Sequence, residues 1–293
     1  MSSAAFSRPA DTRRPPALRT EQLALLKEQL RVQAGIRIDS SQDVIGLCIH
    51  ERMDYLAITD VERYLAVFDD SINARAEWLA LIDLLTVKET RFFRQPEAFE
   101  CLEHHVRSQV QDLPRTSPEF SFWSAGCSHG HELYSMAMVV ESILSEGKPW
   151  LEWHGIGTDI SFQAISASVQ GVYHEDSLAF IPSVYRHRYM EQKLGNRMKV
   201  AEDIRSRTHF FHSNLLHVDC APFADFNAIF CQNVLIYFSR DTQRWIIDQL
   251  VSRLSEGGLL VLGAGEDVGW HNESVRRLQW PGVCAYQKLE TEQ

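Results

Sequence analysis

The stretch FSFWSAGCSHGHELY, residues 120–134, decides the fold that we expect for this chain. The apolar run FSFW ends before a turn that contains Gly126, and a helical pattern begins after Gly130. These features predict a strand, a tight turn and a helix. In an open α/β sheet, a turn of this kind holds a nucleotide-like ligand, because glycine allows the backbone to approach the ligand closely.

The spacing within this turn narrows the class of ligand. Its two glycines are separated by three residues and followed by His131 and Glu132, so the turn matches neither the dinucleotide fingerprint nor the P-loop. A carboxylate in the first turn of a helix repels a phosphate and attracts a cation. S-adenosylmethionine has a sulfonium, an ammonium and no phosphate, so it fits this turn better than a dinucleotide does.

The composition is that of a folded protein and excludes several classes of function. The 293 residues are 45% hydrophobic and carry a net charge of −10, which disfavours a protein whose main task is to bind phosphate backbones. The six cysteines lack C-x-x-C spacing, which indicates reduced thiols rather than a disulfide framework or a zinc site. No apolar run is long enough to cross a bilayer and no signal-peptide core is found, so we expect a cytoplasmic protein.

The first third of the chain predicts a tail followed by a helical domain. Residues 1–19 hold three prolines and four arginines, a composition typical of a disordered tail. Helical patterns then continue to residue 90, with Thr20 expected to cap the first helix and Gly35 to end it. Ser41 and Asp60 are expected to begin later helices. No strand pattern precedes residue 119, so residues 20–90 are expected to form an all-helical N-terminal domain.

Residues 91–293 alternate between strand and helix patterns, which predicts an α/β fold with a mostly parallel, doubly wound sheet. After the first strand, further strands are expected near residues 153–157, 208–211, 228–231, 259–262, 277–280 and 283–287, the last two as an antiparallel hairpin. We expect Gly257 and Gly258 to end the helix that begins at Arg240. Residues 171–206 are longer than a simple crossover requires and predict a small inserted subdomain.

Two charged residues each allow two interpretations. Asp159 ends the second expected strand, where an acidic residue can accept hydrogen bonds from ribose hydroxyls. Alternatively, Asp159 only caps the helix that follows. The glycine turn upstream makes the ribose role the preferred interpretation. Arg94 follows two aromatic residues and is either a functional cation or a surface charge above a packed Phe pair.

Three separated motifs together resemble the chemotaxis receptor methyltransferases, the CheR family. They are TRFFR at 90–94, SAGCSHGHELYS at 124–135 and FCQNVLIYF at 230–238, and shorter matches fall around them in the same order. The resemblance covers nearly the whole chain beyond the tail. It implies a Rossmann-like sheet of an S-adenosylmethionine-dependent methyltransferase, the helical N-terminal domain, and a small β-subdomain inserted at about residues 171–206.

The resemblance also implies roles for individual residues. Arg94 is expected to face the cofactor carboxylate and the reaction centre, and Tyr237 to lie near the transferred methyl group, so these two are the expected catalytic residues. Glu132 is expected to bind the cofactor ammonium, and Asp159 the ribose. The full set of expected cofactor contacts is Thr90, Arg94, Gly126, Glu132, Asp159, Asn214, Leu215, Gln232 and Asn233.

By the same resemblance, the expected activity is methyl transfer from S-adenosylmethionine to glutamate side chains of a chemoreceptor, a methyl-accepting chemotaxis protein. The expected products are a glutamyl methyl ester, which serves signal adaptation, and S-adenosylhomocysteine. The expected partner is the cytoplasmic helices of the membrane receptor, met by a monomer that neither binds nucleic acid nor inserts into the membrane. A glutamate with a pKa of about 4.3 is ionised at neutral pH, so the reaction needs no general base.

The chain departs from the family pattern within its motifs. His129, His131 and Leu133 stand where Thr, Glu and Pro are usual, and Gln232 stands where Arg is usual. Residues 263–266 read GAGE in place of the usual GHSE. No metal site is expected at the two histidines, because no third ligand stands at a suitable spacing.

The second expected helix departs from the family pattern as well. This helix is usually rich in arginine for docking on the receptor, whereas residues 41–55 offer only Arg52 and His50. Two alternatives therefore stand beside the receptor methyltransferase. One is an inactive regulator or adaptor that binds S-adenosylmethionine in a chemosensory pathway, and the other is an enzyme that methylates another protein or a small molecule.

Overall fold

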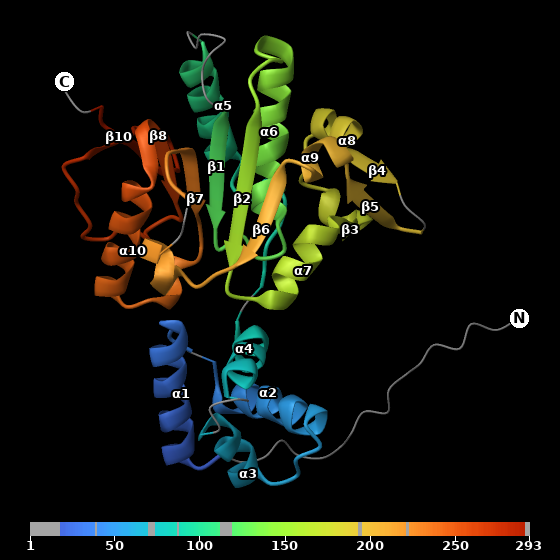
Figure 1. Ribbon diagram of the computed structural model, residues 1–293, viewed down its shortest axis with the longest axis vertical. Coiled ribbons are helices and arrows are strands. Elements are labelled where there is room, and N and C mark those ends of the chain that lie inside the picture. The colour runs from blue at the N-terminus through green and yellow to red at the C-terminus, as the bar shows by residue number, and fades with distance from the viewer. Residues whose placement is uncertain are drawn as a thin grey trace, which may run out of the picture.

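The computed structural model describes residues 18–38, 40–69, 74–86, 88–111, 119–192, 195–220 and 223–290. These residues form a helical unit, a larger unit built on a seven-stranded sheet, and a small three-stranded sheet beside it (Figure 1). The expected tail lies outside the described residues as far as residue 17. In the described part of the chain, no helix combines the length and the apolar character needed to cross a membrane.

The helical unit lies below the sheet in Figure 1. Its described elements are α1 (Thr20–Ala34), α2 (Gln42–Tyr55), α3 (Val61–Leu65), the 3₁₀-helix η1 (Ala66–Asp69) and α4 (Ala74–Leu85). The predicted helix ends are confirmed at three places. Gly35 adopts the left-handed conformation after α1, and the side chains of Ser41 and Asp60 accept backbone N–H bonds at the starts of α2 and α3.

The start of α1 differs from the expectation. The N-cap is Arg19 and not Thr20, and the backbone N–H of Arg19 donates to the side chain of Gln22 at 2.9 Å. Leu18 is only 3% exposed and belongs to the core that the helical unit shares with the sheet. The packed part of the chain therefore includes Leu18, two residues before the expected boundary at residue 20.

A buried ion pair joins two helices of the helical unit. Arg52 of α2 donates hydrogen bonds of 3.0 and 2.8 Å to the carboxylate of Glu77 in α4, and the Tyr64 hydroxyl donates another of 2.7 Å. Glu77 is only 4% exposed. One of the two basic residues of α2, Arg52, is therefore turned into the unit, and the other, His50, lies 3.7 Å from the Asp54 carboxylate.

The larger unit is a sheet with the strand order β6-β2-β1-β7-β8-β10-β9. Its strands are β1 (Phe120–Ala125), β2 (Trp153–Asp159), β6 (Thr208–His212), β7 (Phe226–Cys231), β8 (Leu254–Leu262), β9 (Val275–Arg277) and β10 (Cys284–Lys288). Neighbours from β6 to β8 are parallel, whereas β10 is antiparallel to both β8 and β9. This arrangement confirms the predicted doubly wound sheet and its antiparallel closing hairpin, with bounds shifted by a few residues.

Helices cover both faces of this sheet. They are α5 (Pro96–Val110), α6 (His131–Gly147), α7 (Phe162–Gln170), η3 (Leu215–Cys220), η4 (Leu235–Tyr237) and α10 (Arg240–Ser252). Phe120 and Phe122 of β1 belong to the core shared with α5 and α6, whereas Trp123 and Ala125 belong to the core shared with α10. Side chains of β1 are thus buried on both faces of the sheet, as expected for a strand that helices cover on both sides. The second core continues into the helical unit, so the two units pack against each other.

The small sheet lies beside α6 and has the strand order β3-β5-β4, with both pairs antiparallel (Figure 1). Its elements are β3 (Val172–His174), η2 (Glu175–Leu178), α8 (Ser183–Tyr189), β4 (Met190–Gln192), β5 (Arg197–Val200) and α9 (Glu202–Arg205). Helices α8 and α9 contact α6. The predicted inserted β-subdomain is confirmed, and all of its elements fall within residues 171–206.

The predicted helix end at Gly257 and Gly258 is wrong. Helix α10 already ends at Ser252, and both glycines lie inside β8, whose pairing with β7 shifts register between Phe226 and Ala228. A Cβ on Gly258 would lie 2.9 Å from the Phe226 carbonyl oxygen. Glycine is needed here because two strands approach closely at an irregularity in the sheet.

Replacing Arg52 by Met should lower the free energy of unfolding by about 3 to 5 kcal/mol, because the carboxylate of Glu77 then stays buried without its cation. Urea unfolding followed by circular dichroism measures the change. The matched control is Arg31→Met, because Arg31 pairs with Glu28 while both side chains are 56% exposed. The control should leave the free energy of unfolding nearly unchanged. Equal losses of unfolding free energy in the two variants would contradict the expectation that a buried ion pair is costlier to break than an exposed one.

Candidate active site

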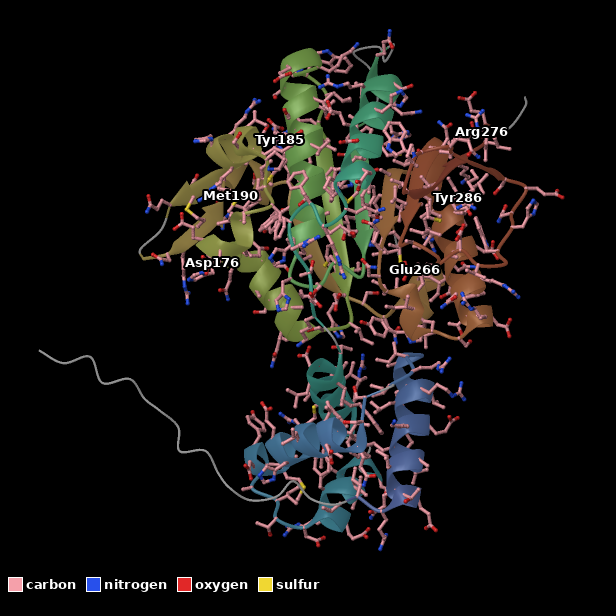
Figure 2. The ribbon with its side chains drawn as sticks, turned by 180° about the vertical axis from the view of Figure 1, so that it is seen from behind. Asp176, Tyr185, Met190, Glu266, Arg276 and Tyr286 are labelled. Atoms are coloured by element: carbon pink, nitrogen blue, oxygen red, sulfur yellow. The ribbon has the colours of Figure 1, made fainter. Side chains whose placement is uncertain are left out.

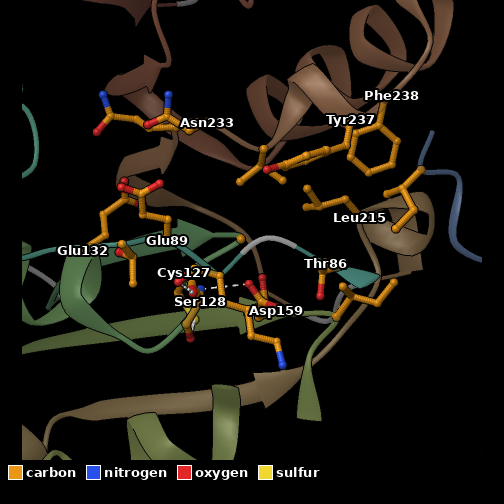
Figure 3. A pocket seen from close by; sticks show the side chains of 18 of the residues that line it. Thr86, Glu89, Cys127, Ser128, Glu132, Asp159, Leu215, Asn233, Tyr237 and Phe238 are labelled. Atoms are coloured by element: carbon orange, nitrogen blue, oxygen red, sulfur yellow. Dashed lines mark hydrogen bonds between the residues drawn. The ribbon is translucent and has the colours of Figure 1, made fainter. Parts of the chain in front are cut away.

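A cavity of about 420 Å³ lies at the carboxyl ends of the parallel strands, between the sheet and the helical unit (Figure 3). Its volume is typical of a small-molecule site. Every residue predicted for cofactor binding or catalysis lines it: Thr90, Arg94, Gly126, Glu132, Asp159, Asn214, Leu215, Gln232, Asn233 and Tyr237. The fold thus brings the three motifs together, while the contact that each residue makes with a ligand stays a prediction.

The turn after β1 forms one wall of the cavity. Gly126 has a φ of 84°, and the N–H groups of Gly126 and Cys127 donate to the Thr158 carbonyl oxygen at 2.8 and 2.9 Å. A Cβ on Gly126 would overlap the side chain of Val234. Glycine is therefore required at this position by the packing of a neighbouring loop, and not only by the approach of a ligand.

Glu132 lies in the first turn of α6, and its side chain reaches the cavity (Figure 3). Its carboxylate accepts a 2.7 Å hydrogen bond from Ser124 Oγ. Burial raises the pKa of Glu132 to about 7; the carboxylate of Glu266 adds to this rise, while the bond from Ser124 and the charge of Arg94 oppose it. A cation bound beside Glu132 would favour its ionised form, so this residue suits a cationic ligand.

Asp159 ends β2 and lines the same cavity (Figure 3). Its carboxylate accepts 2.8 Å hydrogen bonds from the backbone N–H groups of Ser128 and Ser161. Burial raises the pKa of Asp159, and these two bonds oppose the rise. The cap of α7 is Ser161, whose hydroxyl accepts the N–H of Ala164, so capping alone does not account for Asp159. A carboxylate held this way keeps lone pairs for further donors such as ribose hydroxyls.

Arg94 and Tyr237 reach the cavity from segments far apart in the sequence. The two aromatic residues before Arg94 are buried. The second of them, Phe93, has a left-handed φ of 47° and donates its N–H to Ser135 Oγ at 3.1 Å. This turn places Arg94 at the cavity, where its charge opposes the rise in pKa that burial causes at Glu132 and Tyr237. Arg94 is exposed and lines the cavity, and its role as a functional cation stays a prediction.

The helical unit supplies cavity residues that the sequence did not single out. They lie after α1 and around the end of α4: Ile36, Arg37, Ile38, Ser40, Leu85, Thr86, Lys88 and Glu89. The backbone N–H of Arg37 donates to the Tyr237 carbonyl oxygen at 2.6 Å, and Lys88 pairs with Asp83 at 3.1 Å. Lys88 and Glu89 are close in sequence to the motif at residues 90–94. The other residues of this group reach the cavity because the two units pack against each other, so no local pattern identifies them.

The two histidines of the turn, His129 and His131, do not line the cavity. The ring of His131 packs edge-on against Phe92 and Tyr173, with centroid separations of 4.6 Å to each. Burial lowers the pKa of His131 to about 3, so the ring is neutral at physiological pH. The described residues contain no group of three or more His, Cys, Asp or Glu that could hold a metal ion.

A sheet that is parallel from β6 to β8, a glycine turn after its first strand, and a strand-end cavity with two carboxylates are features expected of an S-adenosylmethionine-dependent methyltransferase. The family model described as "CheR methyltransferase, SAM binding domain" matches residues 88–283. The chain is 33% identical to a "Chemotaxis protein methyltransferase" of Klebsiella aerogenes, over 74% of this chain and 72% of the relative. It is 30% identical to the protein of the same name in Escherichia coli, over 91% and 93%. The chain therefore belongs to the CheR methyltransferase family.

The family assigns S-adenosylmethionine as the cofactor, and the residues at the cavity fit this molecule. Glu132 and Asp159 provide acceptors for an ammonium and for hydroxyl groups, and the glycine turn lies against the same cavity. Both carboxylates would repel a phosphate, which this cofactor lacks. The cofactor supplies an activated methyl group when it is bound, and the protein supplies the position and the charge around it.

The affinity for S-adenosylhomocysteine should rise roughly tenfold from pH 5.5 to pH 7. With a pKa of about 7, Glu132 is mostly protonated at pH 5.5 and half ionised at pH 7. Only the ionised carboxylate attracts the ammonium of the ligand, which stays protonated over this range. Isothermal titration calorimetry at several pH values measures the change.

The variant Glu132→Gln should bind more weakly and lose most of this pH dependence. The matched control is Glu141→Gln on the same helix, because Glu141 accepts a bond from Trp153 at 2.6 Å and does not line the cavity. The control should keep the wild-type pH profile. An unchanged profile in Glu132→Gln would contradict the contact between Glu132 and the ammonium.

Proposed function

We propose that this enzyme transfers the methyl group of S-adenosylmethionine to glutamate side chains of a chemoreceptor, forming glutamyl methyl esters. The observation that carries the proposal is the convergence of Glu132, Asp159, Arg94 and Tyr237 on one cavity. The names of the relatives, which are chemotaxis protein methyltransferases, support it. Each ester removes one negative charge from a receptor helix, and this change of charge serves adaptation.

The proposed reaction needs alignment rather than acid–base catalysis. A carboxylate oxygen of the acceptor forms a bond to the methyl carbon while the bond from that carbon to the sulfonium sulfur breaks, and its electron pair goes to sulfur. The products are a neutral ester and a neutral thioether, and no proton moves. The acceptor glutamate, with a pKa of about 4.3, is already ionised at pH 7, so no general base is required.

The cavity residues divide these tasks in our proposal. Glu132 binds the ammonium of the donor, Asp159 binds the ribose hydroxyls, Arg94 faces the donor carboxylate and the reaction centre, and Tyr237 lies near the methyl group. The remaining proposed cofactor contacts are Thr90, Gly126, Asn214, Leu215, Gln232 and Asn233. Opposite charges cancel during the transfer, so a site that excludes water favours it. Apolar lining residues, Phe99, Val234, Leu85 and Phe238 among them, support this exclusion.

Receptor binding by this enzyme does not depend on an arginine-rich α2. The single arginine of that helix, Arg52, is engaged by Glu77 inside the helical unit. The cavity itself is lined by Arg37, Arg91 and Arg94. Their charge suits an acceptor helix that carries glutamates, because charge complementarity fixes the orientation of partners. We therefore place the main contact with the acceptor at the mouth of the cavity.

The proposal includes a place of action and a division of the chain. The enzyme would act as a monomer in the cytoplasm, where it meets the cytoplasmic helices of the receptor and neither enters the membrane nor binds nucleic acid. We place a helical domain at residues 20–90 and the methyltransferase domain at 91–293, with the inserted subdomain at about 171–206. The positions of α1 to α4 and of β3 to β5 support these boundaries.

Labelling tests the acceptor directly. The protein is incubated with S-adenosylmethionine labelled in its methyl group and with receptor-containing membranes, and the receptor band is then treated with mild base. Release of volatile labelled methanol is expected, because carboxyl methyl esters hydrolyse under these conditions. Label that resists base would point to a different acceptor. The absence of any label, with cofactor binding retained, would favour the adaptor interpretation.

Replacing Arg94 by Ala should lower kcat/KM for this methyl transfer about 10- to 100-fold, the effect of losing a charged hydrogen-bond donor at the reaction centre. The rate of labelled methanol formation measures the loss. The matched control is Arg107→Ala, because Arg107 of α5 pairs with Glu103 on the surface at 2.9 Å. The control should keep the wild-type rate. Full activity in Arg94→Ala would refute the role that we give to Arg94.

A further inference from the structure

Glu266 follows β8 and is buried, with 2% exposure, at the end of the sheet that faces the helical unit (Figure 2). Its carboxylate accepts bonds from the backbone N–H groups of Gly263 at 2.8 Å, Asn233 at 3.1 Å and Ile236 at 3.1 Å. Among the residues that the structure describes, no Lys, Arg or His forms an ion pair with it. Burying a carboxylate without a cation costs free energy, which these bonds offset only in part.

Gly263 allows the Glu266 carboxylate to lie this close to the backbone. A Cβ on Gly263 would overlap Glu266 Oε2 and would lie 2.8 Å from the nitrogen of Asn233. The φ of Gly263 is not in the left-handed region, so close approach rather than backbone conformation requires glycine here. Gly263 and Glu266 together enclose the N–H of Asn233, and we call these two residues the clasp.

The loop held by this clasp carries active-site residues. It follows β7 and includes Gln232, Asn233 and Tyr237, all of which line the cavity. Asn233 has a φ of 59°, a left-handed conformation that is uncommon for residues other than glycine. The bond from its N–H to Glu266 stabilises this conformation. The next residue, Val234, packs against Gly126, so the loop also borders the turn after β1.

We propose that Glu266 is a positioning residue of the methyl transfer, which holds the loop of Asn233 and Tyr237 in place against the cofactor cavity. The proposal rests on the function proposed above. Glu266 does not itself line the cavity. It acts through the loop, because three backbone donors on two segments converge on its carboxylate. A displacement of about 1 Å at a reacting group can cost about 100-fold in rate.

The charge of Glu266 provides a second link to the site and a way to measure it. Glu132 is faced by the Ser124 hydroxyl, by the thiols of Cys127 and Cys231, by the guanidinium of Arg94 and by the carboxylate of Glu266, which adds to the rise in its pKa. Glu266 is faced in turn by its backbone donors, by Glu132, by Tyr237 and by the thiol of Cys231. Removing the charge at Glu266 should therefore let Glu132 ionise at lower pH.

Two substitutions separate the effect of the loop from the effect of the charge. Glu266→Gln removes the charge and replaces one carboxylate oxygen by an NH2 group, which cannot accept a bond from a backbone N–H. Gly263→Ala displaces the carboxylate and keeps its charge. Both should lower kcat for methyl transfer at least about tenfold at saturating cofactor. In calorimetry with S-adenosylhomocysteine, the pH midpoint of binding should move to lower pH in Glu266→Gln and stay near the wild-type value in Gly263→Ala.

The neighbouring Asp267→Asn is the matched control, because Asp267 pairs with Tyr286 and Arg277 and lies outside the cavity lining. It should change neither the rate nor the pH midpoint. Wild-type rates in both Gly263→Ala and Glu266→Gln would overturn the proposal, as would an unmoved midpoint in Glu266→Gln. Where Glu266→Gln fails to fold, the rate of Gly263→Ala decides. Calorimetry uses no methyl acceptor. The pH midpoint can therefore be tested even if the acceptor proposed above is wrong.

Discussion

Negative charge held at the carboxyl ends of parallel strands is the constraint on which the rest of this site depends. Glu132, Asp159 and Glu266 are held by neutral donors, namely the hydroxyl of Ser124 and backbone N–H groups. Because burial raises the pKa of Glu132 from 4.5 to about 7, its ionisation opposes folding, and this cost grows as the pH rises through that interval. A cation bound beside Glu132 would offset this cost, because it would favour the ionised carboxylate.

The helical unit completes the cavity around this charge. Asn214 donates to the Gln33 carbonyl oxygen at 3.4 Å, and the Arg37 N–H donates to the Tyr237 carbonyl oxygen at 2.6 Å. A shared apolar core continues from the helical unit to the sheet. These contacts join the end of α1 and the segment after it to two strand-end loops, so the enclosure of the cavity depends on the packing of the two units and not on the sheet alone.

The sequence predicted the sheet and the strand-end wall of the cavity because both depend on local patterns, whereas the wall from the helical unit depends on packing. Alternating strand and helix patterns, the turn at Gly126 and the acid at the end of β2 each require only neighbouring residues, and the order of the motifs brought Arg94 and Tyr237 to the same cavity. The helix end predicted at Gly257 and Gly258 was wrong because a glycine pair can end a helix or fit an irregularity in a strand equally well. Only the pairing of β8 with β7 decides between the two. In the sequence, Glu266 is only part of an altered motif. Its burial and most of its hydrogen-bond donors come from a loop far away in the sequence, so no local pattern identifies its role.

In the proposed reaction, the same charges that assemble the complex favour its separation. The donor enters with a sulfonium and an ammonium, and after transfer it keeps the ammonium alone, so the attraction of the cavity carboxylates for it weakens by one unit of charge. The acceptor changes at the same step from an anion to a neutral ester and loses its attraction to Arg94. Coulombic energy in a poorly hydrated cavity is large compared with its value in water. The Coulombic attraction that the cavity carboxylates and Arg94 exert would therefore be weaker for both products than for both substrates.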